Sequence, residues 1–122
     1  MKIAPLSKKK DFDLLFGKGK RVFKSHLTVI YFFLAGDVCP DCLKITYIVS
    51  KKISPKAVVR NKIKRRMRST MRKVLTEMEL DGEALNRAAS IAVLPSKKIL
   101  GISFQQIYLE IKQVLIKIMR SQ

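Results

Sequence analysis

The chain has 122 residues, enough for one compact domain and too few for two of ordinary size, so we expect a single domain over residues 1–122. Hydrophobic residues make up 48% of the chain, which excludes extended disorder and predicts a packed core. Lysine and arginine number 26 against 9 acidic residues, a net charge of +17. That excess argues against an enzyme for small neutral metabolites. It favours nucleic acid as the partner, with an anionic membrane surface as the weaker alternative.

The start of the chain predicts a short helix capped by Ser7 and ended by Gly17 and Gly19. No apolar run of signal-peptide length opens the sequence. The longest apolar stretch is about half of the roughly 20 residues that a membrane span needs, so we expect a soluble intracellular protein. At helical spacing, one side of the first helix consists of Phe12, Leu15 and Phe16.

Strands are predicted next. Residues 21–25 form a short candidate strand, and residues 27–34 are rich in β-branched and aromatic side chains. Both faces of the second segment are apolar, which is typical of a central strand. Residues 35–41 have the composition of a turn, and residues 43–49 alternate well enough to be the partner strand.

A long helix follows, with Ser54 as its N-cap, Pro55 at its first position and an end near Met78. Its apolar residues recur every three or four positions and make one stripe for packing. That stripe consists of Val59, Ile63, Met67, Met71, Val74 and Met78.

The last elements are a buried strand at residues 90–94 and an amphipathic helix capped by Ser103. The inward side of this helix consists of Phe104, Ile107, Ile111, Val114 and Ile118. The predicted order is therefore α-β-β-β-α-β-α, which indicates an α+β protein built as a two-layer α/β sandwich.

The long helix and the turn before it are strongly basic. Between Lys51 and Lys73 there are 11 basic residues and no acidic one. Projected at about 100° per residue, many of them follow one flank of the apolar stripe. That flank consists of Arg60, Asn61, Lys64, Arg65, Arg68 and Arg72. Guanidinium groups match phosphate oxygens and stay charged, so we interpret the flank as a phosphate-binding surface and not as a merely solvated face.

These residues resemble the signature of the protein subunit of bacterial ribonuclease P. The matching run is SKK at residues 50–52 followed by AVVRNKIKRRMR at residues 57–68. The segment from Leu6 to Gly19 and the strand IAVL at residues 91–94 are also similar to that family.

The resemblance implies a small protein that joins one large RNA, one protein per RNA, in the bacterial cytoplasm and without a membrane. The RNA carries the active site and holds the magnesium ions, and the particle cuts the 5′ leader from precursor tRNA. No cofactor is expected on the protein alone. A left-handed β-α-β crossover around the basic helix is implied as well, against the general right-handed preference. The implied contacts to the catalytic RNA are Lys51, Lys52, Arg60, Asn61, Lys64, Arg65, Arg68 and Arg72.

The resemblance also implies a cleft between the first helix and the sheet that holds the single-stranded leader. Aromatic side chains beside basic ones are the usual means of holding single-stranded RNA. The candidates for this surface are Phe12, Phe16, Lys20, Arg21 and Tyr31. For the three aromatic residues, packing in the core is the alternative interpretation.

No catalytic constellation is predicted on the chain. His26 has no nucleophile motif near it, and the nine acidic residues are scattered. The CxxC of Cys39 and Cys42 is interpreted as two reduced thiols in a loop, with zinc shared across a dimer as the alternative. Two other hypotheses for the whole chain are a ribosomal or general RNA-binding protein and, less favoured, a protein-only nuclease.

Overall fold

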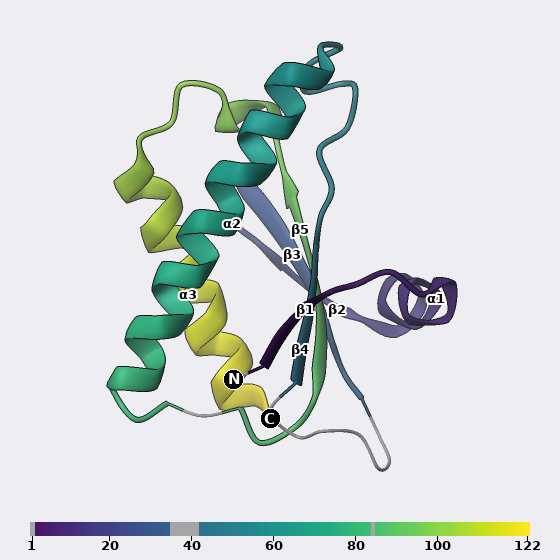
Figure 1. The fold of residues 1–122 in the computed structure, drawn as a ribbon, viewed down its shortest axis with the longest axis vertical. Helices are drawn as coiled ribbons and strands as arrows, with labels where there is room; N and C mark the ends of the chain where they lie inside the picture. The colour runs from purple at the N-terminus through teal and green to yellow at the C-terminus, as the bar shows by residue number, and fades with distance from the viewer. Residues whose placement is uncertain (1, 35–41, 84) are drawn as a thin grey trace.

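A five-stranded sheet lies at the centre of the molecule in a computed structural model that describes residues 2–34, 42–83 and 85–122 (Figure 1). Its strands lie in the order β1-β4-β5-β3-β2. The strands are β1 (Lys2–Pro5), β2 (Lys20–Phe23), β3 (Leu27–Phe33), β4 (Cys42–Tyr47) and β5 (Ala89–Pro95). The helices are α1 (Lys9–Lys18), α2 (Ala57–Leu80) and α3 (Phe104–Ser121), with a short 3-10 helix at Lys97–Ile99.

Helices cover both faces of the sheet, α2 and α3 on one and α1 on the other (Figure 1). Successive residues of β5 point to opposite faces. Ile91 and Val93 therefore join the large core under α2 and α3, whereas Ala92 joins a small core with Leu15 of α1. The sheet with α2 and α3 is the predicted α/β sandwich, and α1 adds the second core.

The helix α2 connects two parallel neighbours, β4 and β5, in which Ile45 pairs with Ile91. Viewed from the side of α2 with β4 running upwards, β5 lies to the left of β4 (Figure 1). The crossover is therefore left-handed, as the resemblance implies. Because β5 returns between β4 and β3, the prediction that the strands near residues 27–34 and 43–49 are partners is wrong.

The edge strand β1 is absent from the predicted order. It pairs in parallel with β4, from Lys2 opposite Cys42 to Pro5 opposite Ile45. All four of its residues are exposed, so the segment lacks the hydrophobic alternation by which a strand is recognised in sequence. Its place in the sheet comes from backbone pairing.

Helix starts were predicted unevenly. The structure confirms Ser103, whose side-chain oxygen accepts a hydrogen bond from the Gln106 N–H. The predictions for Ser7 and Ser54 are wrong, because α1 and α2 have Lys8 and Lys56 as N-caps, without side-chain cap bonds. Pro55 is likewise not the first residue of α2, which begins at Ala57. Ser54 instead accepts from the Lys56 N–H at 3.3 Å, a turn that ends just before the helix.

The end of α1 follows the prediction for Gly19 but not for Gly17, which lies within the helix. Gly19 is the C-cap, and its N–H donates to the carbonyl of Leu15. A Cβ at this position would lie 2.2 Å from that carbonyl oxygen and 2.7 Å from Ile30 Cγ2. Only glycine allows this close approach of α1 to β3.

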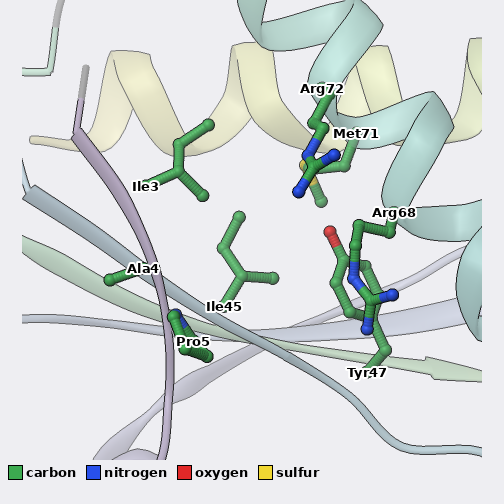
Figure 2. Close-up of a pocket in the computed structure, with 8 residues that line it drawn as sticks. All are labelled: Ile3, Ala4, Pro5, Ile45, Tyr47, Arg68, Met71 and Arg72. Atoms are coloured by element: carbon green, nitrogen blue, oxygen red, sulfur yellow. The ribbon is translucent and has the colours of Figure 1, made fainter.

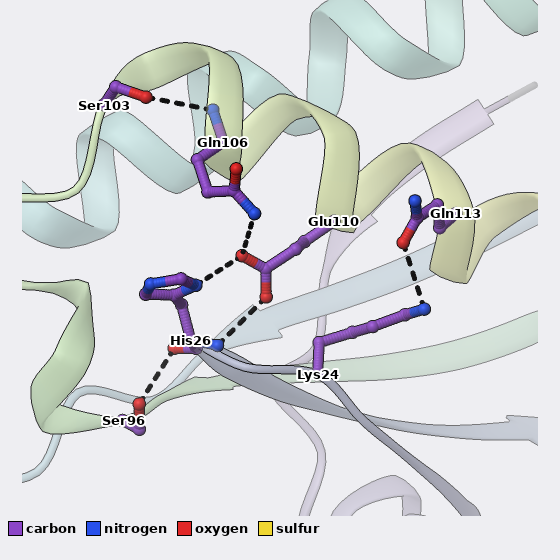
Figure 3. A network of polar contacts seen from close by, with 7 residues as sticks. All are labelled: Lys24, His26, Ser96, Ser103, Gln106, Glu110 and Gln113. Atoms are coloured by element: carbon purple, nitrogen blue, oxygen red, sulfur yellow. Dashed lines mark hydrogen bonds and ion pairs between the residues drawn. The ribbon is translucent and has the colours of Figure 1, made fainter.

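A polar network fastens α3 to the turn between β2 and β3 (Figure 3). Glu110 is buried and accepts from the His26 backbone N–H at 2.9 Å and from His26 Nδ1 at 2.6 Å. Gln106 adds a bond to the same carboxylate, and Lys24 donates to Gln113. The apolar side of α3 meanwhile packs against the sheet, as predicted. No helix within the described residues is long and apolar enough to cross a membrane.

Candidate nucleic-acid interface

The helix α2 rests on the predicted apolar stripe, but only part of that stripe is deeply buried. Met67, Met71, Val74 and Met78 are at most 3% exposed. Ile63 and Val59, nearer the N-terminal end, are only half-buried. The first turns of α2 are thus covered less than its middle, and both flanks of the helix are open to a partner there.

One hydrogen bond joins the start of α2 to the segment before it, and a second closes the turn within that segment. Arg60 Nη1 donates to the carbonyl of Ser54 at 2.9 Å, and the Ile53 N–H donates to the Ser50 carbonyl at 3.1 Å. Lys51 and Lys52 lie in that turn and are exposed. The turn therefore presents two ammonium groups close along the chain to the first arginine of the helix.

We define the α2 basic row as six side chains, all exposed or half-buried: Arg60, Asn61, Lys64, Arg65, Arg68 and Arg72. Four of them recur every four residues, so they rise by about 6 Å per step along the helix. Among the described residues, no carboxylate lies within ion-pairing distance of the row. Within the described part of the chain, the cations of the row are therefore held on one helix without a neutralising carboxylate.

Arg68 also contacts the sheet. Its guanidinium carbon lies 5.5 Å from the centre of the Tyr47 ring on β4, a cation–π contact. Burial raises the pKa of Tyr47 to about 12, although the positive charges of Arg68 and Arg72 act to lower it. The phenol is therefore neutral at physiological pH and available as a hydrogen-bonding group.

The face of the sheet that carries α1 presents an aromatic pair. The Phe12 and Phe16 rings are stacked with centroids 6.3 Å apart and planes 5° apart. Phe12 packs against the small core around Leu15, whereas Phe16 is 38% exposed. Core packing thus applies mainly to Phe12, and Phe16 has ring surface available for a base.

Edge strand β2 adds to this face. Arg21 pairs with Ile30, which belongs to the small core, so Arg21 lies on the α1 side. Phe23, two residues on, shares that side and is 72% exposed. The sequence analysis missed Phe23. Period-two alternation from Arg21 was the signal that could have found it.

Two predicted members of the leader surface lie elsewhere. Tyr31 is 4% exposed within the large core, on the face covered by α2 and α3. Its ring packs edge-on against Phe33 and leaves no surface for a base, so we correct the prediction and remove Tyr31. Lys20 pairs with Tyr31 and therefore lies on that same face, exposed at the sheet edge.

Charges around α1 are mainly basic. Lys8, Lys9 and Lys10 are exposed at its start. Asp11 pairs with Lys44 of β4 at 3.2 Å, which fastens the helix to the sheet. The interface near α1 therefore combines exposed lysines with the rings of Phe16 and of Phe23 on β2.

The cysteine motif is only partly described. Cys42 is half-buried at the first position of β4, and Cys39 lies outside the described residues, as does the predicted turn at 35–41. Within the part of the chain that is described, no three His, Cys, Asp or Glu side chains gather where they could share a metal ion. Zinc binding by the CxxC stays an untested alternative.

Comparison with known proteins gives one consistent family. Residues 1–119 match the family model described as Ribonuclease P. The ribonuclease P protein component of Microcystis aeruginosa is 34% identical over 115 residues, covering 92% of this chain and 88% of that protein. The corresponding protein of Rickettsia peacockii is 29% identical over 120 residues, covering 96% of this chain and 98% of its own length.

Solved structures agree. The RNase P protein of Staphylococcus aureus matches with a TM-score of 0.67 and 26% identity over 91% of each chain. That of Thermotoga maritima matches with a TM-score of 0.70 and 24% identity, covering 92% of this chain and 94% of its own. At this identity the second match concerns the fold alone.

Proposed function

Since the chain belongs to the ribonuclease P protein family and is thus a subunit of an endoribonuclease for tRNA processing, we propose that it contacts two RNA partners through two separate surfaces. The α2 basic row and the turn with Lys51 and Lys52 bind the catalytic RNA. The α1 face binds the single-stranded leader of precursor tRNA. One protein binds one RNA.

The observation that carries the first part is the state of the α2 basic row. Its cations are exposed or half-buried and have no carboxylate partner among the described residues. A helix with so many like charges repels itself by a few tenths of a kcal/mol for each neighbouring pair. RNA phosphates remove that repulsion and release counterions, which supplies the binding free energy.

The second part is supported by the α1 face. Phe16 and Phe23 expose ring surface there, and Arg21 lies on the same side of β2 as Phe23. Stacking on aromatic rings beside cations holds single strands without reading sequence. A leader of variable sequence needs that kind of contact.

We propose that the chemistry belongs to the RNA. A protein nuclease with two metals needs carboxylates converging on sites about 4 Å apart. The acidic residues that the structure describes do not gather in that way. Magnesium is accordingly assigned to the RNA, and the protein supplies positive charge that lowers the magnesium concentration needed by the folded particle.

Reconstitution tests this function. The chain is mixed with a bacterial ribonuclease P RNA, and precursor-tRNA cleavage is measured at low magnesium with and without protein. We expect cleavage at the 5′ end of the mature tRNA only when both components are present. RNA-free protein that cleaves the substrate would instead reveal a protein-only nuclease.

Salt dependence is the second arm of that experiment. If the protein covers roughly six phosphates, its affinity for the catalytic RNA falls by about 10³ between 50 and 200 mM salt. An affinity that is flat across this range would contradict the electrostatic mechanism. Equal affinity for ribosomal RNA would favour a general RNA-binding protein.

A further inference from the structure

A pocket of about 410 Å³ opens between edge strand β1, strand β4 and helix α2. That volume lies within the range of roughly 300–1,000 Å³ typical of small-molecule sites. Figure 2 shows the side chains around it. The lining residues are Ile3, Ala4, Pro5, Ile45, Tyr47, Arg68, Met71 and Arg72.

The pocket has one apolar side and one cationic side. Ile3 stands on the β1 side and is 47% exposed, and Ile45 and Met71 are nearly buried. Opposite Ile3, Arg68 and Arg72 extend from α2 toward the same space, with the Tyr47 phenol beside them (Figure 2). An occupant must therefore be apolar at one end and anionic at the other.

The two arginines suit a phosphate group. They are one helical turn apart, and among the described residues no carboxylate pairs with either. Arg68 is already oriented by its contact with the Tyr47 ring, which reduces the entropy lost when it binds. Two guanidinium forks can hold one phosphate through parallel hydrogen bonds.

The apolar side suits the face of a nucleobase. Ile3 offers exposed aliphatic surface, the buried side chains of Ile45 and Met71 complete the apolar lining, and the neutral Tyr47 hydroxyl offers a hydrogen-bonding group for a base edge. A paired base is stacked in its duplex and cannot enter such a pocket, whereas a base from a bulge, loop or single strand can.

We propose that the β1–α2 pocket binds one unpaired nucleotide of an RNA, with its base against Ile3 and its phosphate between Arg68 and Arg72. This rests on the proposed function, in which α2 faces the catalytic RNA. The pocket is separate from the α1 face, because β1 and β2 are opposite edges of the sheet and α2 and α1 cover opposite faces.

The test uses the full chain labelled at its methionine methyl groups and observed by NMR. Adenosine 5′-monophosphate, adenosine and inorganic phosphate are titrated separately. We expect the monophosphate to shift the Met71 methyl signal but not that of Met119 on α3. It should bind about tenfold more tightly than phosphate or adenosine, because only the nucleotide contacts both sides of the pocket. Phosphate that binds as tightly as the nucleotide would reduce the pocket to an anion site and overturn the proposal.

Three variants locate the binding. Arg72→Ala should weaken both the nucleotide and phosphate about tenfold. Ile3→Ala should weaken the nucleotide severalfold and leave phosphate unchanged, because it removes only apolar surface at an exposed position. Arg66→Ala, which removes the same charge at an exposed position of α2 outside the pocket, should change neither.

Amide spectra of all three variants check that they are folded. A Met71 shift that persists unchanged in Arg72→Ala or Ile3→Ala would place the nucleotide elsewhere and overturn the proposal. A phosphoserine peptide is titrated as a further probe, and binding as tight as that of the nucleotide would also overturn the proposal. Because these titrations contain no catalytic RNA, their failure leaves reconstituted cleavage as the separate test of the proposed function.

Discussion

The helices α2 and α3 cover the same face of the sheet, but the charge of Glu110 on α3 is buried and hydrogen-bonded whereas the charges on α2 lie at the surface. The buried Glu110 of α3 accepts hydrogen bonds from His26 and Gln106 (Figure 3). The α2 basic row has exposed cations and, within the described residues, no anionic partner. Since both helices bury an apolar stripe against one core, they differ in where these charges lie, inside the fold for Glu110 of α3 and at the surface for the α2 basic row.

This comparison separates a contact that stabilises the fold from charges to which the proposed function assigns RNA binding. A buried carboxylate without partners would destabilise the fold, so the chain supplies the partners itself. Exposed cations do not need partners for folding, and their mutual repulsion is relieved only by binding. Stability is therefore expected to depend on Glu110 of α3, and RNA affinity on the α2 basic row.

The largest effect is expected for removing two arginines of the row. Arg65→Ala combined with Arg68→Ala should lower affinity for the catalytic RNA about 100-fold and reduce the salt slope by about two, because two phosphate contacts are lost. Filter binding across several salt concentrations measures both quantities. Lys62→Ala with Arg66→Ala is the matched control, since both residues are exposed cations of α2 outside the row. Equal losses in the two pairs would show diffuse attraction instead of a defined row.

The stability of the fold should depend on the hydrogen bonds of Glu110 on α3. Glu110→Ala leaves the partly buried N–H of His26 without its acceptor, so we expect the free energy of unfolding to fall by about 1–3 kcal/mol. Urea denaturation followed by circular dichroism measures the change. Glu83→Ala, at an exposed acidic position, should change it by less than about 0.5 kcal/mol. The RNA affinity of the folded Glu110→Ala protein should equal that of the unchanged protein. A large loss of RNA affinity would instead show that α3 also contributes to RNA binding.

The α1 face gives a smaller, selective effect. Phe16→Ala should reduce the preference for precursor tRNA over mature tRNA by about tenfold, because one stacked base loses its ring. Binding of both ligands to the reconstituted particle is compared. Leu80→Ala, at an apolar position 81% exposed on α2, is the control and should leave the preference unchanged. Equal weakening of both ligands by Phe16→Ala would contradict a separate leader surface.

The smallest effect is expected in how the free energy of unfolding falls at acidic pH. Burial acts to raise the pKa of Glu110, but hydrogen bonds from the His26 backbone, the His26 ring and Gln106 together hold that pKa below its ordinary value of 4.5. The unfolded chain therefore takes up this proton first. The stabilisation is complete above the ordinary value and is lost as pH falls through the lowered one. Denaturation at several acidic pH values should show a shallower acid loss in Glu110→Gln, and parallel curves would show that Glu110 makes no such contribution.

Local chemistry in the sequence was enough to predict most elements and the whole α2 basic row. Apolar residues at three- and four-residue spacing located α2 and α3, and an arginine at a helical position next to a buried stripe is exposed in any packing that buries the stripe. The family resemblance supplied the left-handed crossover, which no periodicity contains. Caps were less secure, because Ser54 has the composition of an N-cap and serves a turn instead.

The tertiary structure decided which strand faces are open and what the sheet edges hold. Both faces of β3 are apolar, so only the packing of α2 and α3 on one side determines that Tyr31 is buried, while the opposite face carries Phe16 and Phe23. β1 has no apolar pattern and joins the sheet through its backbone, so the pocket that it forms with α2 could not be foreseen. Sequence periodicity specifies which side of an element is buried, but contacts between distant segments specify which buried sides meet.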